Sequence, residues 1–168
     1  MFGWADFERE APSVAAAGRE LIARYRYLLA GTIRSDGTPR ISPVEAHLVD
    51  GALVLALEAG TLKVRDLRRD PRIVLNAPIV DPDDPELEFK MRGRAVPISA
   101  GEPWATAAEA IERASGWRPG PEWYVVSIDI DDAAAIAWRD GEMTMDLWRR
   151  GRGIEHRERR IALGSRGS

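Results

Sequence analysis

The segment TLKVRDLRRDPR, residues 61–72, combines a hydroxyl group, a lysine and four arginines, which is a composition suited to binding an anion. Its five cationic side chains outnumber its two aspartates, so its net charge is +3. Thr61 follows a glycine and stands where it can cap a short helix over 61–70, and a helix N-terminus offers free N–H groups and partial positive charge. With Lys63 two residues further on, these groups predict a phosphate site. The alternative is a solvated helix face with local Asp–Arg pairs.

Arg40 is the second residue suited to an anion, and it opens the segment PRISPV. In a strand over 39–49, Arg40, Ser42 and Val44 share one face because successive side chains alternate. Burying an arginine and a serine is costly without an anionic or polar partner, whereas a solvent-facing pair needs none, and both interpretations stay open. Pro43 in mid-strand indicates an edge or a bulge, where a ligand can approach.

Catalysis by side chains has little support in this sequence. There is no cysteine, which excludes a thiol nucleophile, a disulfide framework and a cysteine-ligated metal. His47 and His156 are far apart and lack partners at metal-ligand spacing, and no serine lies in a nucleophile-elbow motif. A G-x-G-x-x-G loop is absent as well. We therefore expect no catalytic side chain and no metal site, so an enzyme of this sequence would depend on a bound cofactor.

The composition is that of one ordinary globular domain, with 168 residues, 45% hydrophobic residues and a net charge of −3. No apolar run approaches the roughly 18 residues of a membrane-spanning helix, and the first residues lack the features of a signal peptide. We therefore expect a cytoplasmic protein with no membrane partner. Six arginines over 149–160 raise the question of nucleic acid, but the acidic balance of the chain argues against it.

Three Asp-Gly pairs, at 36–37, 50–51 and 140–141, lie between apolar or alternating runs and predict β-hairpins. The strands that we expect cover 27–34, 39–49, 52–60, 72–80, 87–98, 124–138 and 142–150. Three helices fill the gaps between them. One is capped by Ser13 and keeps its apolar spacing to Leu28, one covers 61–70, and one follows the capping-box pattern Ser99-x-x-Glu102.

These elements predict an α+β fold, mainly β, with six or seven antiparallel strands in a closed or nearly closed barrel. The expected domain covers residues 1–150, and residues 151–168 are expected to form a loose tail rich in arginine and glycine. An acidic, proline-punctuated loop is expected at 81–86. Most of the six tryptophans fall in the second half, where core and dimer packing is the first interpretation and a cofactor lining the second.

In this order, the segments SDGTPRISPV, DGALVLALEAGTLKVRDLRRDPRIVL and MRGRAV resemble the pyridoxamine 5′-phosphate oxidase-like family of FMN- and deazaflavin-binding split β-barrels. The resemblance covers residues 13–98 well and continues more loosely to about residue 152. It implies a split barrel that forms a homodimer, with the cofactor bound at the interface. It also implies the residues that contact the cofactor. The phosphate is held by Arg40, Thr61 and Lys63, and further contacts come from Ser42, Val44, Leu57 and Arg65.

Two departures refine what the resemblance implies. True pyridoxamine-phosphate oxidases carry an arginine where this chain has Leu62, and they end in an arginine–leucine–x–proline run where this chain has RIALGSRGS. The likeness is therefore to deazaflavin-dependent reductases, which share the LRRDPR phrase, rather than to vitamin B6 oxidases. It implies an oxidoreductase that binds FMN or coenzyme F-420 and transfers a hydride to a small substrate.

Two other functions remain open. One branch of the family binds haem instead, and a haem-binding protein that degrades or sequesters haem is the alternative. Its axial ligand would be His47 or His156. A member that has lost its cofactor and serves as a binding module is the third reading.

Overall fold

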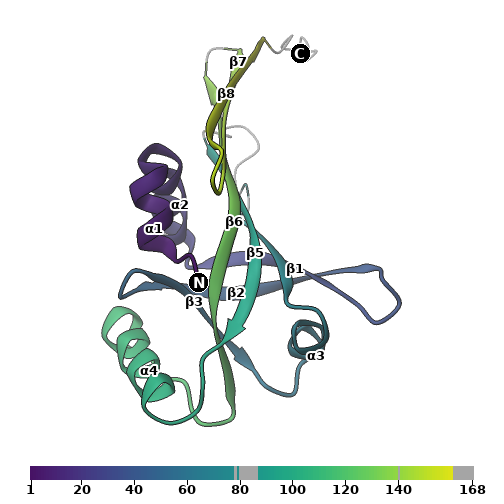
Figure 1. The fold of residues 1–168 in the computed structure, drawn as a ribbon, viewed down its shortest axis with the longest axis vertical. Coiled ribbons are helices and arrows are strands. Elements are labelled where there is room, and N and C mark those ends of the chain that lie inside the picture. The colour runs from purple at the N-terminus through teal and green to yellow at the C-terminus, as the bar shows by residue number, and fades with distance from the viewer. Residues whose placement is uncertain (78, 80–86, 140, 161–168) are drawn as a thin grey trace, which may run out of the picture.

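The structure is a computed structural model that describes residues 1–77, 79, 87–139 and 141–160. Four helices and eight strands are present in this part of the chain (Figure 1). In chain order they are α1 (Trp4–Glu10), α2 (Pro12–Tyr25), β1 (Tyr27–Ile33), β2 (Pro39–Val49), β3 (Ala52–Glu58), α3 (Leu62–Arg69), β4 (Arg72–Asn76), β5 (Leu87–Pro97), α4 (Glu102–Ser115), β6 (Trp123–Arg139), β7 (Glu142–Arg149) and β8 (Gly153–Arg160).

All of the strands pair antiparallel, in the order β3-β2-β1-β4-β5-β6-β7-β8. An additional pairing of β3 with β6 closes the first six strands into a barrel. β6 is 17 residues long, so its first part belongs to the barrel and its last part continues into the β7–β8 hairpin that stands above it (Figure 1). The prediction of a mainly β, antiparallel barrel with flanking helices is confirmed.

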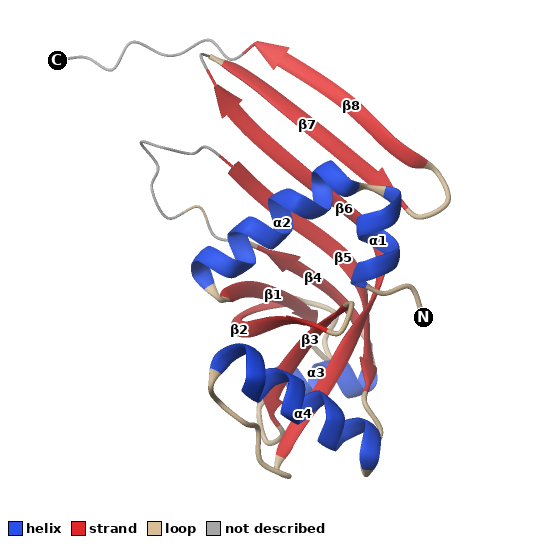
Figure 2. Cartoon of the chain, turned by 90° about the vertical axis from the view of Figure 1, so that its left-hand side faces the viewer, coloured by secondary structure: helices blue, strands red, loops and turns tan. Residues whose placement is uncertain are grey.

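Two helical layers cover the barrel on different sides. α1 and α2 lie along the long strands β5 to β7, and α4 lies at the opposite end (Figure 2). α2 packs closely, because a Cβ built on Gly18 would approach the Phe89 ring to 2.6 Å. Under α4, a second apolar cluster forms on the outer face of the barrel around Val54, Val125 and Ile111.

The N-terminal residues pack against Trp148 of β7, which is fully buried. Phe2 stacks on its indole with the ring centroids 5.5 Å apart, and Phe7 lies 4.9 Å from it. The Trp148 Nε1–H donates to Glu10 at 3.3 Å. Core packing therefore accounts for the presence of tryptophan at position 148, and also at the buried position 4 of α1.

The second Asp-Gly pair forms a tight hairpin as predicted. Asp50 and Gly51 both have positive φ, 48° and 74°, which the type I′ turn requires. Gly37 also has a positive φ, in the turn between β1 and β2. Asp140, of the third pair, lies outside the described residues, and so does the proline-punctuated loop at 81–86.

Several boundary predictions were wrong. Residues 4–10 form α1, which the sequence analysis did not expect, and neither expected serine caps its helix. α2 begins after Ala11 and α4 after Gly101, so Ser13 lies inside a helix and Ser99 lies before one. α2 ends at Tyr25 rather than Leu28, because Arg26 adopts the left-handed conformation with φ 61°.

The C-terminal segment is more ordered than expected. Residues 153–160, which we placed in a loose tail, form β8 and pair with β7 along its whole length. Residues 161–168 lie outside the described part of the chain. None of the helices in that described part is long and apolar enough to cross a bilayer.

Candidate anion and cofactor site

The barrel is split along β2. Residues Pro39–Glu45 of this strand pair with β1, whereas only Ala46–Val49 pair with β3. On its other edge β3 pairs with β6 from Val54 to Glu58, so its last residues, beyond Leu55, pair with β6 and not with β2. Over 39–45, the edge of β2 that faces away from β1 therefore carries no strand among the described residues. Backbone N–H and C=O groups on such an edge are available to a ligand.

α3 begins beside this split with its N-terminus open. Thr61 is the N-cap residue, as predicted, but its hydroxyl donates to the Glu58 carbonyl at 2.8 Å and makes no capping bond to the helix. The first intrahelical N–H is that of Arg65, which donates to the Thr61 carbonyl, so the preceding N–H groups of the helix have no intrahelical acceptor. Just before the cap, a Cβ built on Gly60 would meet nothing within 4 Å.

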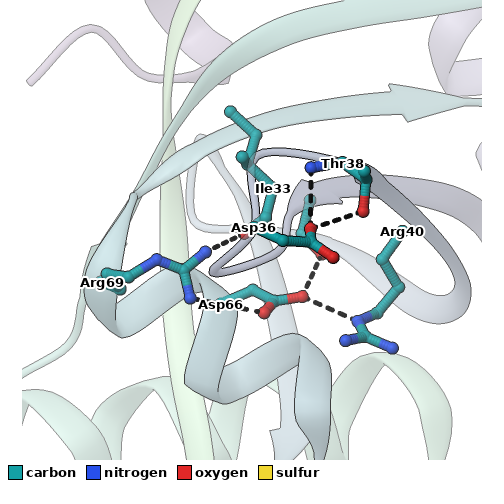
Figure 3. Close-up of polar contacts among 7 residues, drawn as sticks. Ile33, Asp36, Thr38, Arg40, Asp66 and Arg69 are labelled. Atoms are coloured by element: carbon teal, nitrogen blue, oxygen red, sulfur yellow. Dashed lines mark hydrogen bonds and ion pairs between the residues drawn. The ribbon is translucent and has the colours of Figure 1, made fainter.

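Arg40 joins β2 to α3 through an ion pair. Its Nε–H donates to Oδ2 of Asp66 at 2.7 Å, and the Thr32 hydroxyl donates to the same oxygen at 3.1 Å (Figure 3). The Asp66 side chain is 6% exposed and that of Arg40 20%. Arg40 is therefore held in place by a buried carboxylate.

Asp66 has a second cationic neighbour in Arg69. Its Nη1 lies 3.7 Å from Oδ1 of Asp66, and its Nη2 donates to the Ile33 carbonyl at the end of β1 (Figure 3). Burial raises the pKa of Asp66, but the hydrogen bonds from Arg40 and Thr32 and the charges of Arg40 and Arg69 outweigh it, so the pKa lies below its usual value. Asp66 is thus an ionised carboxylate at neutral pH.

Lys63 and Arg65 project from the first turns of α3. Lys63 is half-buried and precedes Asp66 by three residues, so it lies on the same face of the helix, one turn closer to the N-terminus. Within the described part of the chain it makes no ion pair. Arg65 is exposed. Arg40 thus contacts Asp66 on α3, and Lys63 lies one helical turn before that aspartate.

The remaining predicted contacts occupy two different environments. Ser42 is half-buried and follows Arg40 on the same face of β2. Val44 and Leu57 are buried members of the main core cluster, so they support the site from behind rather than lining its surface. Asp66 and Thr32 were missed by the sequence analysis. The available signal was an aspartate between the buried helix positions Val64 and Leu67, where an unpaired charge is costly.

A cavity of about 490 Å³ opens on the outer face of the neighbouring strands. Val74 covers Gly31 at its floor, and an Arg92–Asp132 ion pair of 2.6 Å stands at its rim. Thr32, which pairs with Arg40 in the β1–β2 register, also lines it. Next to this cavity Ile41 is 72% exposed, opposite Gly31.

The two histidines lie away from this site. The His47 side chain is 5% exposed, and burial lowers its pKa, although Glu45 opposes this shift with its Oε1 3.9 Å from Nε2. His156 lies on β8, with Nδ1 2.5 Å from Oδ1 of Asp146 and Nε2 3.0 Å from Oε1 of Glu158. Its hydrogen bonds to Asp146 and Glu158 raise its pKa.

Comparison with known proteins gives a family and a fold. The sequence profile described as pyridoxamine 5′-phosphate oxidase matches residues 14–138. No curated protein matches the chain. Among solved structures, a pyridoxamine 5′-phosphate oxidase-related, FMN-binding protein from Nostoc punctiforme is similar with a TM-score of 0.65 and 16% identity, covering 90% of this chain and 96% of that one.

Two further structures have the same fold. A haem-binding protein from Mycobacterium smegmatis has a TM-score of 0.62 and 16% identity, covering 90% of each chain. A structure named F420 reductase has a TM-score of 0.50 and 21% identity, covering 68% of this chain and 94% of that one.

Proposed function

Since this chain belongs to the pyridoxamine 5′-phosphate oxidase family, we propose that it binds FMN or coenzyme F-420 and acts as an oxidoreductase on a small substrate. The observation that carries the proposal is the Arg40–Asp66 ion pair. It joins β2, which has an unpaired edge, to α3, whose first turn contains Lys63 and N–H groups without an intrahelical acceptor. Similar structures named for FMN and F420 agree with it.

The residues present fit a phosphate-bearing cofactor. Arg40 and Lys63 supply two cations, and the N–H groups that follow Thr61 supply backbone donors, as at other helix N-termini that bind phosphate. In this proposal Ser42 and Arg65, which are accessible, contact the rest of the molecule, and the buried Val44 and Leu57 support the strands that carry the site. When bound, the cofactor supplies the hydride-transfer chemistry.

The chain's own part in this reaction is to bind and orient. We assign no side chain the role of acid, base or nucleophile. Arg40, Lys63 and the backbone N–H groups that follow Thr61 would hold the phosphate of the cofactor. Leu62, in the first turn of α3, is 49% exposed and adds no charge there. Oxidation of pyridoxamine phosphate is therefore not the proposed reaction.

A second copy of the chain completes the proposed site, as the family resemblance implies. The outer face of β1, β2 and β4 presents Ile41 and Val74 to solvent beside the 490 Å³ cavity. Apolar side chains on an open sheet face are suited to burial against an identical face. The proposal is thus a homodimer in the cytoplasm, with the cofactor between the two copies.

Haem binding is the alternative, because one structure with this fold is named for it. The structure favours His47 over His156 as its axial ligand. The His47 Nε2 atom is buried without a hydrogen-bond partner among the described residues, and His47 lines a cavity of about 320 Å³ between α2, β2 and α4. Both nitrogens of His156 contact carboxylates.

Absorbance of the purified protein, followed by titration with FMN, coenzyme F-420 and haemin, separates these functions. Saturable binding of FMN or F-420 that weakens in Lys63→Ala supports the proposal. A Soret band that is lost in His47→Ala, without flavin binding, supports the haem alternative. Failure to bind any of the three identifies a cofactor-free binding module.

A further inference from the structure

We propose that Asp66 is a positioning residue of the phosphate site, and that it acts by holding Arg40 in the orientation that leaves both terminal guanidinium nitrogens free for an anion. The inference rests on the proposed function and adds a residue that its cofactor contacts do not include. Asp66 itself does not touch the cofactor in this proposal. It acts through Arg40 alone.

The geometry of the contact carries the proposal. An arginine has five N–H donors, and Asp66 uses only the one on Nε. Nη1 and Nη2 make no hydrogen bond or ion pair elsewhere in the described chain, and the contact drawn from Arg40 to Asp66 in Figure 3 is the one from Nε. A guanidinium fixed at Nε presents these two nitrogens as a fork, which matches the oxygens of a phosphate.

The surroundings of Asp66 show that the carboxylate is itself fixed. Thr32 of β1 and Arg40 of β2 both donate to its Oδ2, and Arg69 approaches its Oδ1. The residue is on α3, whose N-terminus forms the other half of the site. Asp66 therefore sets the distance between the two halves, because one side chain connects the strand that bears Arg40 to the helix that bears Lys63.

The positioning role and the charge of Asp66 predict opposite effects on phosphate binding. Asp66 is a negative charge beside a site for an anion, so removing it should strengthen phosphate binding if the charge were all that mattered. If Asp66 positions Arg40, its removal weakens binding, because the anion must then order a free arginine side chain. The sign of the change in affinity distinguishes the two roles.

The test compares Asp66→Asn with Asp70→Asn. Both variants replace a carboxylate by an amide in the same segment, but Asp70 pairs with Arg72 and does not contact Arg40. With FMN as the probe, we expect Asp66→Asn to bind about tenfold more weakly and Asp70→Asn to bind as the wild type does. Riboflavin, which lacks the phosphate, should bind both variants equally. An unchanged or tighter affinity for FMN in Asp66→Asn, or equal losses for FMN and riboflavin, overturns the proposal.

Two further variants show whether the effect passes through Arg40. The Asp66→Asn change should have no effect on FMN affinity in an Arg40→Ala background. If Asp66→Asn does not fold, Arg40→Lys serves instead, because it keeps the charge but loses the planar donor fork. FMN affinity equal to that of the wild type in Arg40→Lys contradicts the proposal.

A measurement without cofactor separates this inference from the proposed function. The Arg40 Nε–H should exchange slowly in the NMR spectrum of the wild type and of Asp70→Asn, and rapidly in Asp66→Asn. Rapid exchange in the wild type overturns the positioning role even if FMN binds. If the Arg40 Nε–H exchanges slowly in a wild-type protein that binds neither FMN nor F-420, Asp66 does hold Arg40, but the proposed function is wrong.

Discussion

Arg40 and Asp66 are 26 residues apart in the sequence, yet Nε of the arginine lies 2.7 Å from Oδ2 of the aspartate. The contact joins β2 to α3, the helix that follows β3. Because Arg40 has a protein partner, its side chain serves both the fold and the candidate site. The residue types and spacing alone predict a ligand contact or a solvent-facing side chain for Arg40, not this ion pair within the fold.

Arg40→Ala is expected to reduce both cofactor affinity and stability. Loss of a charge-assisted contact should weaken FMN or F-420 binding by about ten- to hundredfold. The same change removes a donor from the buried Asp66, which should lower the free energy of unfolding by roughly 1–3 kcal/mol. Fluorescence titration measures the first effect and denaturant unfolding of the apo protein the second. Normal stability with normal affinity would show that the ion pair has neither role.

Lys63→Ala is expected to weaken cofactor binding by a similar factor while leaving stability unchanged, because no ion pair joins Lys63 to the rest of the described chain. Arg68→Ala is the matched control. It removes one positive charge from the same helix, but Arg68 lies over the Tyr124 ring, 4.9 Å from its centroid. Arg69 is a poorer control, since it contacts Asp66. Equal losses in Lys63→Ala and Arg68→Ala would indicate a diffuse basic surface.

The β7–β8 hairpin is expected to lose stability as the pH rises. Asp146 and Glu158 raise the pKa of His156 in the folded protein above the unfolded value of about 6.5. The histidine is thus stabilising while it is protonated in both states, and this contribution disappears as the pH rises through the folded pKa. Amide hydrogen exchange of β8, corrected for the intrinsic rate, should show less protection above this range. His156→Gln should remove the pH dependence.

A homodimer at micromolar concentration is expected, and Ile41→Asp should dissociate it, because it places a charge on the exposed apolar face of β2. Val96→Asp is the control, since Val96 is also exposed but lies near the end of β5. Light scattering measures the mass of each variant. A stable wild-type mass near 18.6 kDa would contradict the two-copy site.

Pyridoxamine phosphate and pyridoxine phosphate should not be oxidised at an appreciable rate, even with FMN supplied. The first turn of α3 carries Leu62 where the vitamin B6 oxidases have an additional arginine. An assay of pyridoxal phosphate formation, with a true oxidase run in parallel, measures this directly. Turnover comparable to that enzyme would show that Leu62 does not exclude the substrate.

The sequence predicted the barrel because its strands are either apolar or alternate between apolar and polar residues, and because Asp-Gly pairs mark several of its turns. The same approach missed β8, whose residues are all exposed. Its order comes from cross-strand pairs such as His156–Asp146 rather than from a hydrophobic face. The helix caps were misplaced because serine is only one of several residues that can precede a helix, and Ala11 and Gly101 take that place here.

The cationic residues of the candidate site could be predicted from the sequence, but the role of the Asp66 carboxylate could not. Arg40, Thr61 and Lys63 are recognisable from charge, spacing and the start of a helix. The role of Asp66 can be recognised only in the folded structure, because its partners come from β1, β2 and α3. The position of Asp66 between Val64 and Leu67 indicates a buried carboxylate, but the sequence alone does not say which residues pair with it.

The contact between the first residues and Trp148 has a consequence for the order of folding during synthesis. Phe2 donates its backbone N–H to Asp129, 127 residues later, and Trp148 reaches Glu10 across 138 residues. Contacts of such long range form only after most of the chain has left the ribosome. Phe2 and Phe7 therefore lack their Trp148 partner until β7 has been synthesised, so these aromatic side chains are less protected in the nascent chain than in the folded protein.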